Sequence, residues 1–219
     1  MASRAPRSPR SGGSPRSRTD APARARREAI LAAAHTAFSR TGYRRTSMED
    51  IAREGGVSRA ALYLHFPNKE AIFRSLAEAL HREALARAET ALALEGPIQE
   101  RVQGALEGKS LRFVEILGAS PHGAELVETS SRECGDIAAA TEQRFVRRLA
   151  DVLSGAAAAG ELDLARAGLS PAAAAELLVQ ASRGLKQPGT SPALYRRRLA
   201  DLVRVLLAGL GARAGAPGG

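Results

Sequence analysis

The stretch TSMEDIAREGGVSRAALYLHFPNK, residues 46–69, decides the fold of this chain. Thr46 and Glu49 have the spacing of a capping box, so we expect a helix to begin at Ser47. The glycine pair at 55–56 ends this helix, because glycine adopts the left-handed conformation at no steric cost. The first half of the stretch therefore predicts one short helix followed by a tight turn.

The second half of the stretch carries the start signals of two further helices. Ser58 is a favourable N-cap for a helix over residues 59–64. Pro67 ends that helix, and Asn68 can cap a third helix that begins at Lys69. Two short helices joined by a glycine-containing turn of about three or four residues form the helix-turn-helix pattern.

Six short motifs stand out in and beside this stretch: Thr46-Ser47, Asp50-Ile51-Ala52, Gly56-Val57-Ser58, Leu62-Tyr63, His65-Phe66 and Lys69-Glu70. Together they resemble the N-terminal signature of the tetracycline-repressor (TetR) family of transcriptional regulators, over roughly residues 26–76. The resemblance implies an all-α fold of about nine helices. Three would form a DNA-binding head, and a long helix would join it to a body that binds an effector and dimerises.

The composition also favours an all-α protein of one or two domains. The 219 residues are enough to bury a core, which must be mostly aliphatic because aromatic residues make up only 4%. Proline and glycine mark segment ends and do not alternate with β-branched runs. The single cysteine, Cys134, excludes an internal disulfide and a cysteine-based zinc site. We expect it to be a buried apolar residue, with a redox-sensing thiol as the alternative.

The basic charge is concentrated at the N-terminus, where residues 1–27 carry +7 of the total +9. Residues 1–22 are mostly Arg, Ser, Pro and Gly, so we expect a disordered arm. The arm is either a loose tail or a source of salt-sensitive, non-specific DNA affinity. No apolar stretch approaches the roughly 18–20 residues that span a membrane, and no secretory signal is evident, so we expect a cytoplasmic protein without a membrane partner.

Helical periodicity continues along the rest of the chain and sets the expected domain boundaries. We expect a first helix over about 23–40, a head over 23–68 and a body over 69–212, with a frayed tail at 213–219. One apolar stripe runs from Lys69 to about Leu94, which predicts a helix long enough to connect head and body mechanically. The later helices are expected at about 98–117 (as one or two), 124–132, 136–159, 171–186 and 192–210.

The first turn of the second motif helix should read bases, since this turn enters the major groove in helix-turn-helix proteins. Arg59 is the best candidate because its guanidinium can pair with O6 and N7 of guanine, and a solvated surface position is the alternative. Ala60 and Ala61 offer only apolar contact, for instance to a thymine methyl. The expected base contacts are Ser58, Arg59, Ala60 and Ala61.

Phosphate contacts are expected around this helix. The resemblance implies such roles for Thr46, Tyr63 and Lys69, while Ser47 lies at a helix N-terminus that favours an anion. His65 either joins them or packs against its neighbour. The expected phosphate contacts, with two arginines added on electrostatic grounds, are Arg44, Arg45, Thr46, Ser47, Tyr63, His65 and Lys69.

The body has no catalytic constellation, and we expect neither an enzyme nor a cofactor. His122, Glu125 and Glu128 have helical spacing, which is more typical of a solvated helix face than of a metal site. The resemblance implies instead a cavity for a small-molecule effector, and the aliphatic composition favours an apolar one. Candidate lining residues are Phe113, Leu117, His122, Phe145, Gln180 and Arg183.

The last helix has an apolar face too broad for one neighbour, and small residues on the helix before it allow close approach of a partner. Both features predict a homodimer about a two-fold axis, unless the faces are used up within one body. The expected interface residues are Leu177, Ala181, Leu185, Tyr195, Leu199, Leu202 and Leu206.

These observations favour a homodimeric, sequence-specific DNA-binding regulator. The working hypothesis is a repressor that binds a near-palindromic double-stranded operator and is released by a small molecule. An activator, or a regulator without an effector, would have the same sequence features. The alternatives from other classes are a helical ligand-binding or enzymatic domain, and a sequence-neutral DNA-coating protein that uses the arginine-rich arm.

Overall fold

The computed structural model describes residues 20–187 and 189–211, and within them the chain forms nine α-helices and no strand. The all-α prediction is therefore confirmed for this part of the chain. None of these helices is both long and apolar enough to cross a membrane. The helices are α1 Asp20–Thr41, α2 Met48–Glu54, α3 Arg59–His65, α4 Lys69–Leu92, α5 Ile98–Ala119, α6 Gly123–Glu133, α7 Gly135–Ala158, α8 Pro171–Arg183 and α9 Pro192–Gly209.

The predicted arm and tail fall almost entirely outside the described residues. α1 begins at Asp20, three residues before the predicted start at Ala23. The last three residues of the predicted arm therefore belong to this helix.

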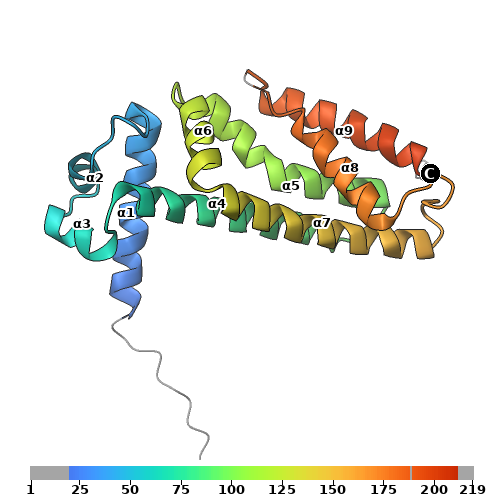
Figure 1. Ribbon diagram of the computed structural model, residues 1–219, viewed down its shortest axis with the longest axis horizontal. Coiled ribbons are helices and arrows are strands. Elements are labelled where there is room, and N and C mark those ends of the chain that lie inside the picture. Colours follow the sequence, from blue (N-terminus) through green and yellow to red (C-terminus); the bar gives the residue numbers. More distant parts are fainter. Residues whose placement is uncertain (1–19, 188, 212–219) are drawn as a thin grey trace, which may run out of the picture.

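The molecule has a small head of α1–α3 at one end, and α4 runs from this head along the body (Figure 1). α4 packs against both α5 and α7. The head has its own core, in which Phe73 packs edge to face against Phe38 and Tyr43, and these two rings are tilted relative to each other. The same core contains Cys134, which is fully buried as predicted and reaches it from the junction of α6 and α7.

The helix-turn-helix forms by local signals close to the predicted ones. Ser58 and Asn68 cap α3 and α4 through their side chains, as expected. Gly56 has φ +60°, so the turn after α2 requires the left-handed conformation that glycine adopts freely. Leu62 is fully buried and anchors α3 on the head core.

α5 is one continuous helix, whereas the sequence allowed either one helix or two over this range. Gly104 and Gly108 do not weaken it but lie against α4, the first facing Ala91 and the second the backbone at Arg87. Their missing side chains allow α4 and α5 to approach closely. A separate core of the body is built from α4, α5, α7, α8 and α9, and it includes the fully buried Phe145.

Candidate functional site

The first turn of α3 faces solvent. Ser58 and Arg59 are exposed, and the Ser58 hydroxyl accepts a hydrogen bond from the backbone N–H of Ala61 at 3.1 Å. The guanidinium of Arg59 lies 2.6 Å from Oε1 of Glu49 on α2 and 5.5 Å from the ring centroid of Tyr63. Thus the residue expected to read bases is already held by a carboxylate and an aromatic ring.

Two residues of this face were missed by the sequence analysis. Glu49 is the partner of Arg59, and the sequence analysis had assigned it to a capping box. Leu64 is 86% exposed at the end of α3, although it is apolar. Helical periodicity contains the signal for Leu64: once Leu62 is the buried anchor, a residue two positions later points away from the core.

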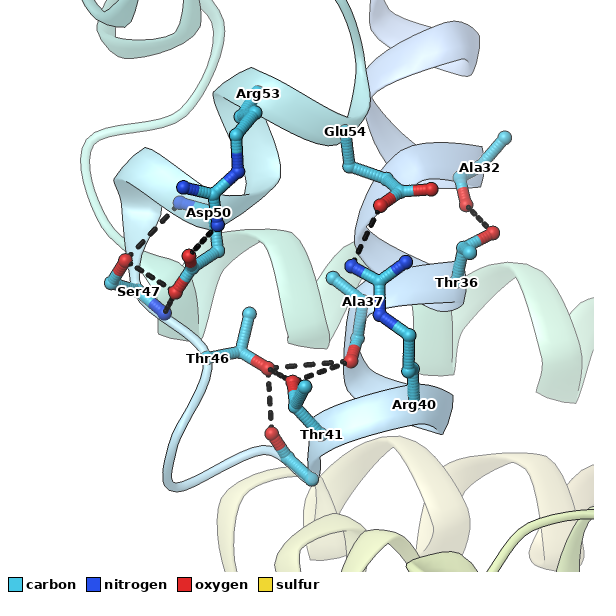
Figure 2. Close-up of polar contacts among 11 residues, drawn as sticks. Ala32, Thr36, Ala37, Arg40, Thr41, Thr46, Ser47, Asp50, Arg53 and Glu54 are labelled. Carbon is cyan, nitrogen blue, oxygen red and sulfur yellow. Dashed lines mark hydrogen bonds and ion pairs between the residues drawn. The ribbon is translucent and has the colours of Figure 1, made fainter.

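The capping box at the start of α2 uses different residues from those predicted. Ser47, not Thr46, is the N-cap, and Asp50, not Glu49, completes the box (Figure 2). The Asp50 carboxylate accepts hydrogen bonds from the backbone N–H of Ser47 at 3.0 Å and from its hydroxyl at 2.7 Å, and these bonds lower the pKa of Asp50. The prediction was wrong by one residue because aspartate closes the box as well as glutamate does.

Thr46 is buried and faces the head interior. It is 1% exposed, and its hydroxyl donates to the carbonyl of Gly42 at 2.6 Å and lies 2.8 Å from the Thr41 hydroxyl (Figure 2). The side chain expected to contact phosphate is therefore turned away from solvent, and we drop it from the candidate contacts. Ser47 is half-buried, and the Asp50 carboxylate already occupies the anion position beside it.

Lys69 ties the start of α4 to the loop that precedes α2. Its ammonium donates to the carbonyls of Tyr43 and Thr46, both at 2.9 Å, and lies 4.5 Å from the Tyr43 ring centroid. Burial, and then the nearby carboxylate of Glu70, raises the pKa of Tyr43 to about 12. A third, longer hydrogen bond of 3.4 Å goes from the Lys69 ammonium to the carbonyl of Arg44. Lys69 thus positions the loop, and a phosphate would have to compete with three carbonyls for its ammonium group.

The remaining rim candidates do face solvent. Arg44 and Arg45 are exposed in the loop before α2, and Tyr63 is 41% exposed on α3. His65 is half-buried at the end of α3, next to the buried Phe66, so both alternatives for it remain. The candidate DNA face therefore consists of α3 and this loop.

α6 joins the body to the loop of the head. The backbone N–H of Arg44 donates to Oε1 of Glu125 at 2.8 Å, and His122 Nδ1 lies 3.5 Å from Oε2 of the same carboxylate. Ser120 donates to the carbonyl of Ser39 on α1 at 2.6 Å. The prediction of a merely solvated face was wrong for Glu125, because this carboxylate accepts a backbone hydrogen bond from the head.

A partly open cavity of about 200 Å³ lies between α1, α4, α5 and α6. Of the predicted effector residues, only Phe113 lines it. Phe145 is packed in the body core, Gln180 and Arg183 are exposed on α8, and His122 belongs to the joint with the head. The side chain of Leu117 lies outside the described part. The apolar lining is formed mainly by Phe38, Phe73, Leu76, Leu80, Phe113, Ile116 and Leu126.

The residues predicted for the dimer interface fall into a buried group and a group that is at least partly exposed. Tyr195 and Leu199 are fully buried in the body core, so the prediction that they lie in the dimer interface was wrong. They belong to the side of α9 that faces this core. Leu177 is 46% exposed on α8. Val205 belongs to the broad apolar face expected for the last helix, although it was not among the expected interface residues, and it is 66% exposed on α9. The other predicted residues are partly exposed: Ala181, Leu185, Leu202 and Leu206.

Comparisons with known proteins agree with the head and with the whole fold. The family model described as bacterial regulatory proteins, tetR family, matches residues 30–76. The HTH-type transcriptional regulator TtgR of Pseudomonas putida is 42% identical over 73 residues, which cover 32% of this chain and 35% of TtgR. The HTH-type transcriptional repressor BepR of Brucella suis is 44% identical over 59 residues, which cover 27% of this chain and 28% of BepR. The chain thus matches about a third of the length of these relatives.

One solved structure extends the similarity to the body. SmeT, the repressor of the Stenotrophomonas maltophilia multidrug efflux pump SmeDEF, is 26% identical with a TM-score of 0.58. The match covers 88% of this chain and 94% of SmeT. The similarity to SmeT in the arrangement of helices therefore includes the body.

Proposed function

This chain belongs to the TetR family of transcriptional regulators, and we propose that it is a homodimeric repressor released from its operator by a small molecule. The observation that carries the proposal is the exposed first turn of α3, which presents Arg59. The loop before α2 is held by α6, and α6 also lines the cavity. TtgR and BepR are regulators, and SmeT and BepR are repressors. Family membership also fits the expectation of a regulator that is not an enzyme.

DNA reading is assigned to α3 and its rim. Arg59 would exchange Glu49 for a guanine edge, because a bidentate contact to O6 and N7 offers the guanidinium two acceptors. Arg44, Arg45 and Tyr63 are the proposed phosphate contacts, which would fix the register of the head and give the salt dependence. Ala60 and Ala61 leave room for apolar contact with a base.

Dimerisation is assigned to α8 and α9, which pack on each other. Leu177 and Val205 would be covered by a second copy, together with the partly exposed leucines beside them. A two-fold axis through this face sets the two heads for two half-sites of a near-palindrome.

Release is assigned to the cavity beside the head. Its wall includes α1 of the head, α4 that connects head and body, and α6 that holds the loop before α2. A ligand that fits better when these helices move apart would favour a spacing of the two heads that the operator does not match. This is a population shift, and it requires tighter ligand binding to the released state.

The test is to select fragments of genomic DNA with the purified protein at about 0.15 M salt and to sequence them. We expect a shared inverted repeat, lost on Arg59→Ala and kept by Arg82→Ala, which removes an exposed arginine of α4 away from the DNA face. Enrichment without a common motif would favour the sequence-neutral DNA-coating alternative. No enrichment would overturn the proposal in favour of a ligand-binding domain.

A further inference from the structure

Lysine is rare in this chain, and its placement is unusual. Only three of the 32 basic residues are lysines, and the others are arginines. Lys69 is used in the head, as described above. The other two, Lys109 on α5 and Lys186 after α8, come together in the body beside one aromatic ring, with ammonium groups 6.0 and 5.9 Å from the ring centroid of Phe113.

A histidine completes this cluster from α4. His81 is only 6% exposed, and its ring centroid lies 5.0 Å from that of Phe113. Its Nδ1 is buried and has no hydrogen-bond partner among the described residues. A buried polar nitrogen without a protein partner lacks a hydrogen bond that water would supply, so it is available as a contact for a ligand.

The charges around Phe113 do not balance. Glu142 on α7 is the carboxylate that faces the cluster, and it already pairs with Arg183 of α8 at 2.6 Å. Burial, reinforced by their mutual repulsion and by Arg183, lowers the pKa of Lys186 to about 8, and burial also lowers the pKa of Lys109. Within the described part of the chain, two half-buried ammonium groups therefore remain without an anion of their own, which is costly unless a ligand supplies one.

Phe113 also lines the apolar cavity between α1, α4, α5 and α6. The cationic cluster and the cavity are thus neighbouring compartments that share one ring. A molecule with a charged end and an apolar body would satisfy both, whereas a purely apolar molecule would leave the two lysines uncompensated.

We propose that the effector is an amphipathic carboxylate, with its carboxylate between Lys109, Lys186 and His81 and its apolar part in the cavity beside Phe113. This inference rests on the proposed function as an effector-released regulator, and it replaces the expectation of an apolar effector. The ion pair of Glu142 with Arg183 is neutral and His81 is uncharged, so two ammonium groups and an imidazole N–H remain as donors for a carboxylate.

The experiment is calorimetric titration of the full chain with octanoate and decanoate below their micellar concentrations. Decan-1-ol and decyltrimethylammonium, which have the same apolar chain with a neutral or cationic end, serve as comparison ligands. We expect one carboxylate to bind per subunit at least about tenfold more tightly than either comparison ligand. The double variant Lys109→Gln/Lys186→Gln should lose at least about tenfold in carboxylate affinity and leave decan-1-ol binding unchanged.

Arg82→Gln, which removes a positive charge from the exposed side of α4, is the matched control and should bind the carboxylates like the wild type. The single variant Lys186→Met tests the same point should the double variant fail to fold. Equal binding of decanoate and decan-1-ol, no binding of either carboxylate, or full carboxylate affinity in a folded lysine variant would overturn the proposal.

The same samples separate this inference from the proposed function. If an uncharged ligand releases the protein from its operator, the proposal of an effector-released repressor is supported and the proposal of a carboxylate site is contradicted. If a carboxylate binds specifically but operator affinity does not change, the carboxylate site is supported and its role in release from DNA is contradicted.

Discussion

The backbone N–H of Arg44 donates a 2.8 Å hydrogen bond to the carboxylate of Glu125, which lies 81 residues later in the chain. Arg44 belongs to the loop that precedes the helix-turn-helix, and Glu125 stands in the first turn of α6, one wall of the cavity. A Cβ added at Gly42 would clash with this carboxylate, so the loop lies directly on it. The contact links the cavity to the DNA-binding head.

Loss of the Glu125 carboxylate should therefore weaken the joint. We expect Glu125→Ala to lower the free energy of unfolding by about 0.5–1.5 kcal/mol, because the fold loses the hydrogen bond between the exposed N–H of Arg44 and this carboxylate. Glu128→Ala is the matched control: Glu128 lies 3.7 Å from the Arg44 guanidinium but is 66% exposed, so its loss should cost less than about 0.5 kcal/mol. Urea unfolding of both variants measures this, and equal destabilisation would contradict the assignment.

The ion pair of Arg59 with Glu49 should oppose DNA binding, because the guanidinium must leave the carboxylate to reach a base. Glu49→Gln should tighten operator binding by up to about fivefold, which corresponds to an exposed pair of about 0.2–1 kcal/mol. Glu54→Gln removes the same charge at the other end of α2, where the partner is Arg40, and reports the general effect of charge. Fluorescence anisotropy with labelled operator is the measurement. Equal tightening by both variants would show that the pair itself has no effect.

The helix-turn-helix was predictable because its signals are local. Ser58, Gly56 and Asn68 act within a few residues of themselves, and all three have the expected roles in the structure. The error at Thr46 is instructive, since two adjacent residues could both cap a helix. Burial decided between them: the Thr46 methyl and hydroxyl fit the head interior, which a local pattern does not encode.

The cavity was poorly predicted because it depends on which helices meet. Phe113 was expected there, but its neighbours come from α1, α4 and α6 rather than from α7 and α8. Phe113 and Phe145 both stand in an Arg-Phe-Val triplet in the sequence, and only the packing of α7 places Phe145 in the body core. The cluster of Lys109 and Lys186 joins residues far apart in the chain. Its one sequence signal was the use of lysine in a chain that otherwise prefers arginine.

Two glycines in helices offer a test of the α4–α5 contact. A Cβ at Gly108 would lie 3.1–3.2 Å from the backbone of Arg87 and Ala88, whereas nothing lies within 4 Å of one at Gly155 on α7. We expect Gly108→Ala to destabilise the fold by about 1–3 kcal/mol through overpacking. Gly155→Ala should stabilise it by about 0.4–1 kcal/mol, because alanine restricts the unfolded chain. Thermal and urea unfolding measure the sign of the stability change in each variant. Stabilisation by both variants would contradict the close approach of α4 and α5 at Gly108.

The dimer assignment predicts that a charge on α9 will separate the subunits. Val205 is 66% exposed, and a glutamate there would be buried without a partner against the second copy. Val205→Glu should give a folded monomer by sedimentation velocity. Leu94→Glu, at a leucine that is 60% exposed in the turn after α4, should leave the dimer intact. A dimeric Val205→Glu variant would place the interface elsewhere.

Lys186 predicts how stability changes with pH in the absence of ligand. The folded chain releases the Lys186 proton at a pKa of about 8, while an unfolded lysine holds it until about 10.4. Between these values the unfolded state binds more protons, so this residue makes stability rise with pH. The groups that face it are His81 on α4, Lys109 on α5, and the pair of Glu142 with Arg183.

Other groups titrate in the same range, so the useful quantity is the difference between wild type and Lys186→Met. Burial raises the pKa of Cys134, which makes stability fall as pH rises past the thiol's usual value. That contribution is common to both proteins and cancels. The wild type should gain about 2–3 kcal/mol relative to Lys186→Met between about pH 7 and 10.5, from a shift of two or more pKa units. Urea unfolding across this range measures the difference. A constant difference would mean that Lys186 is solvated in the free protein, and that the cluster around Phe113 has no unmet charge for a carboxylate to neutralise.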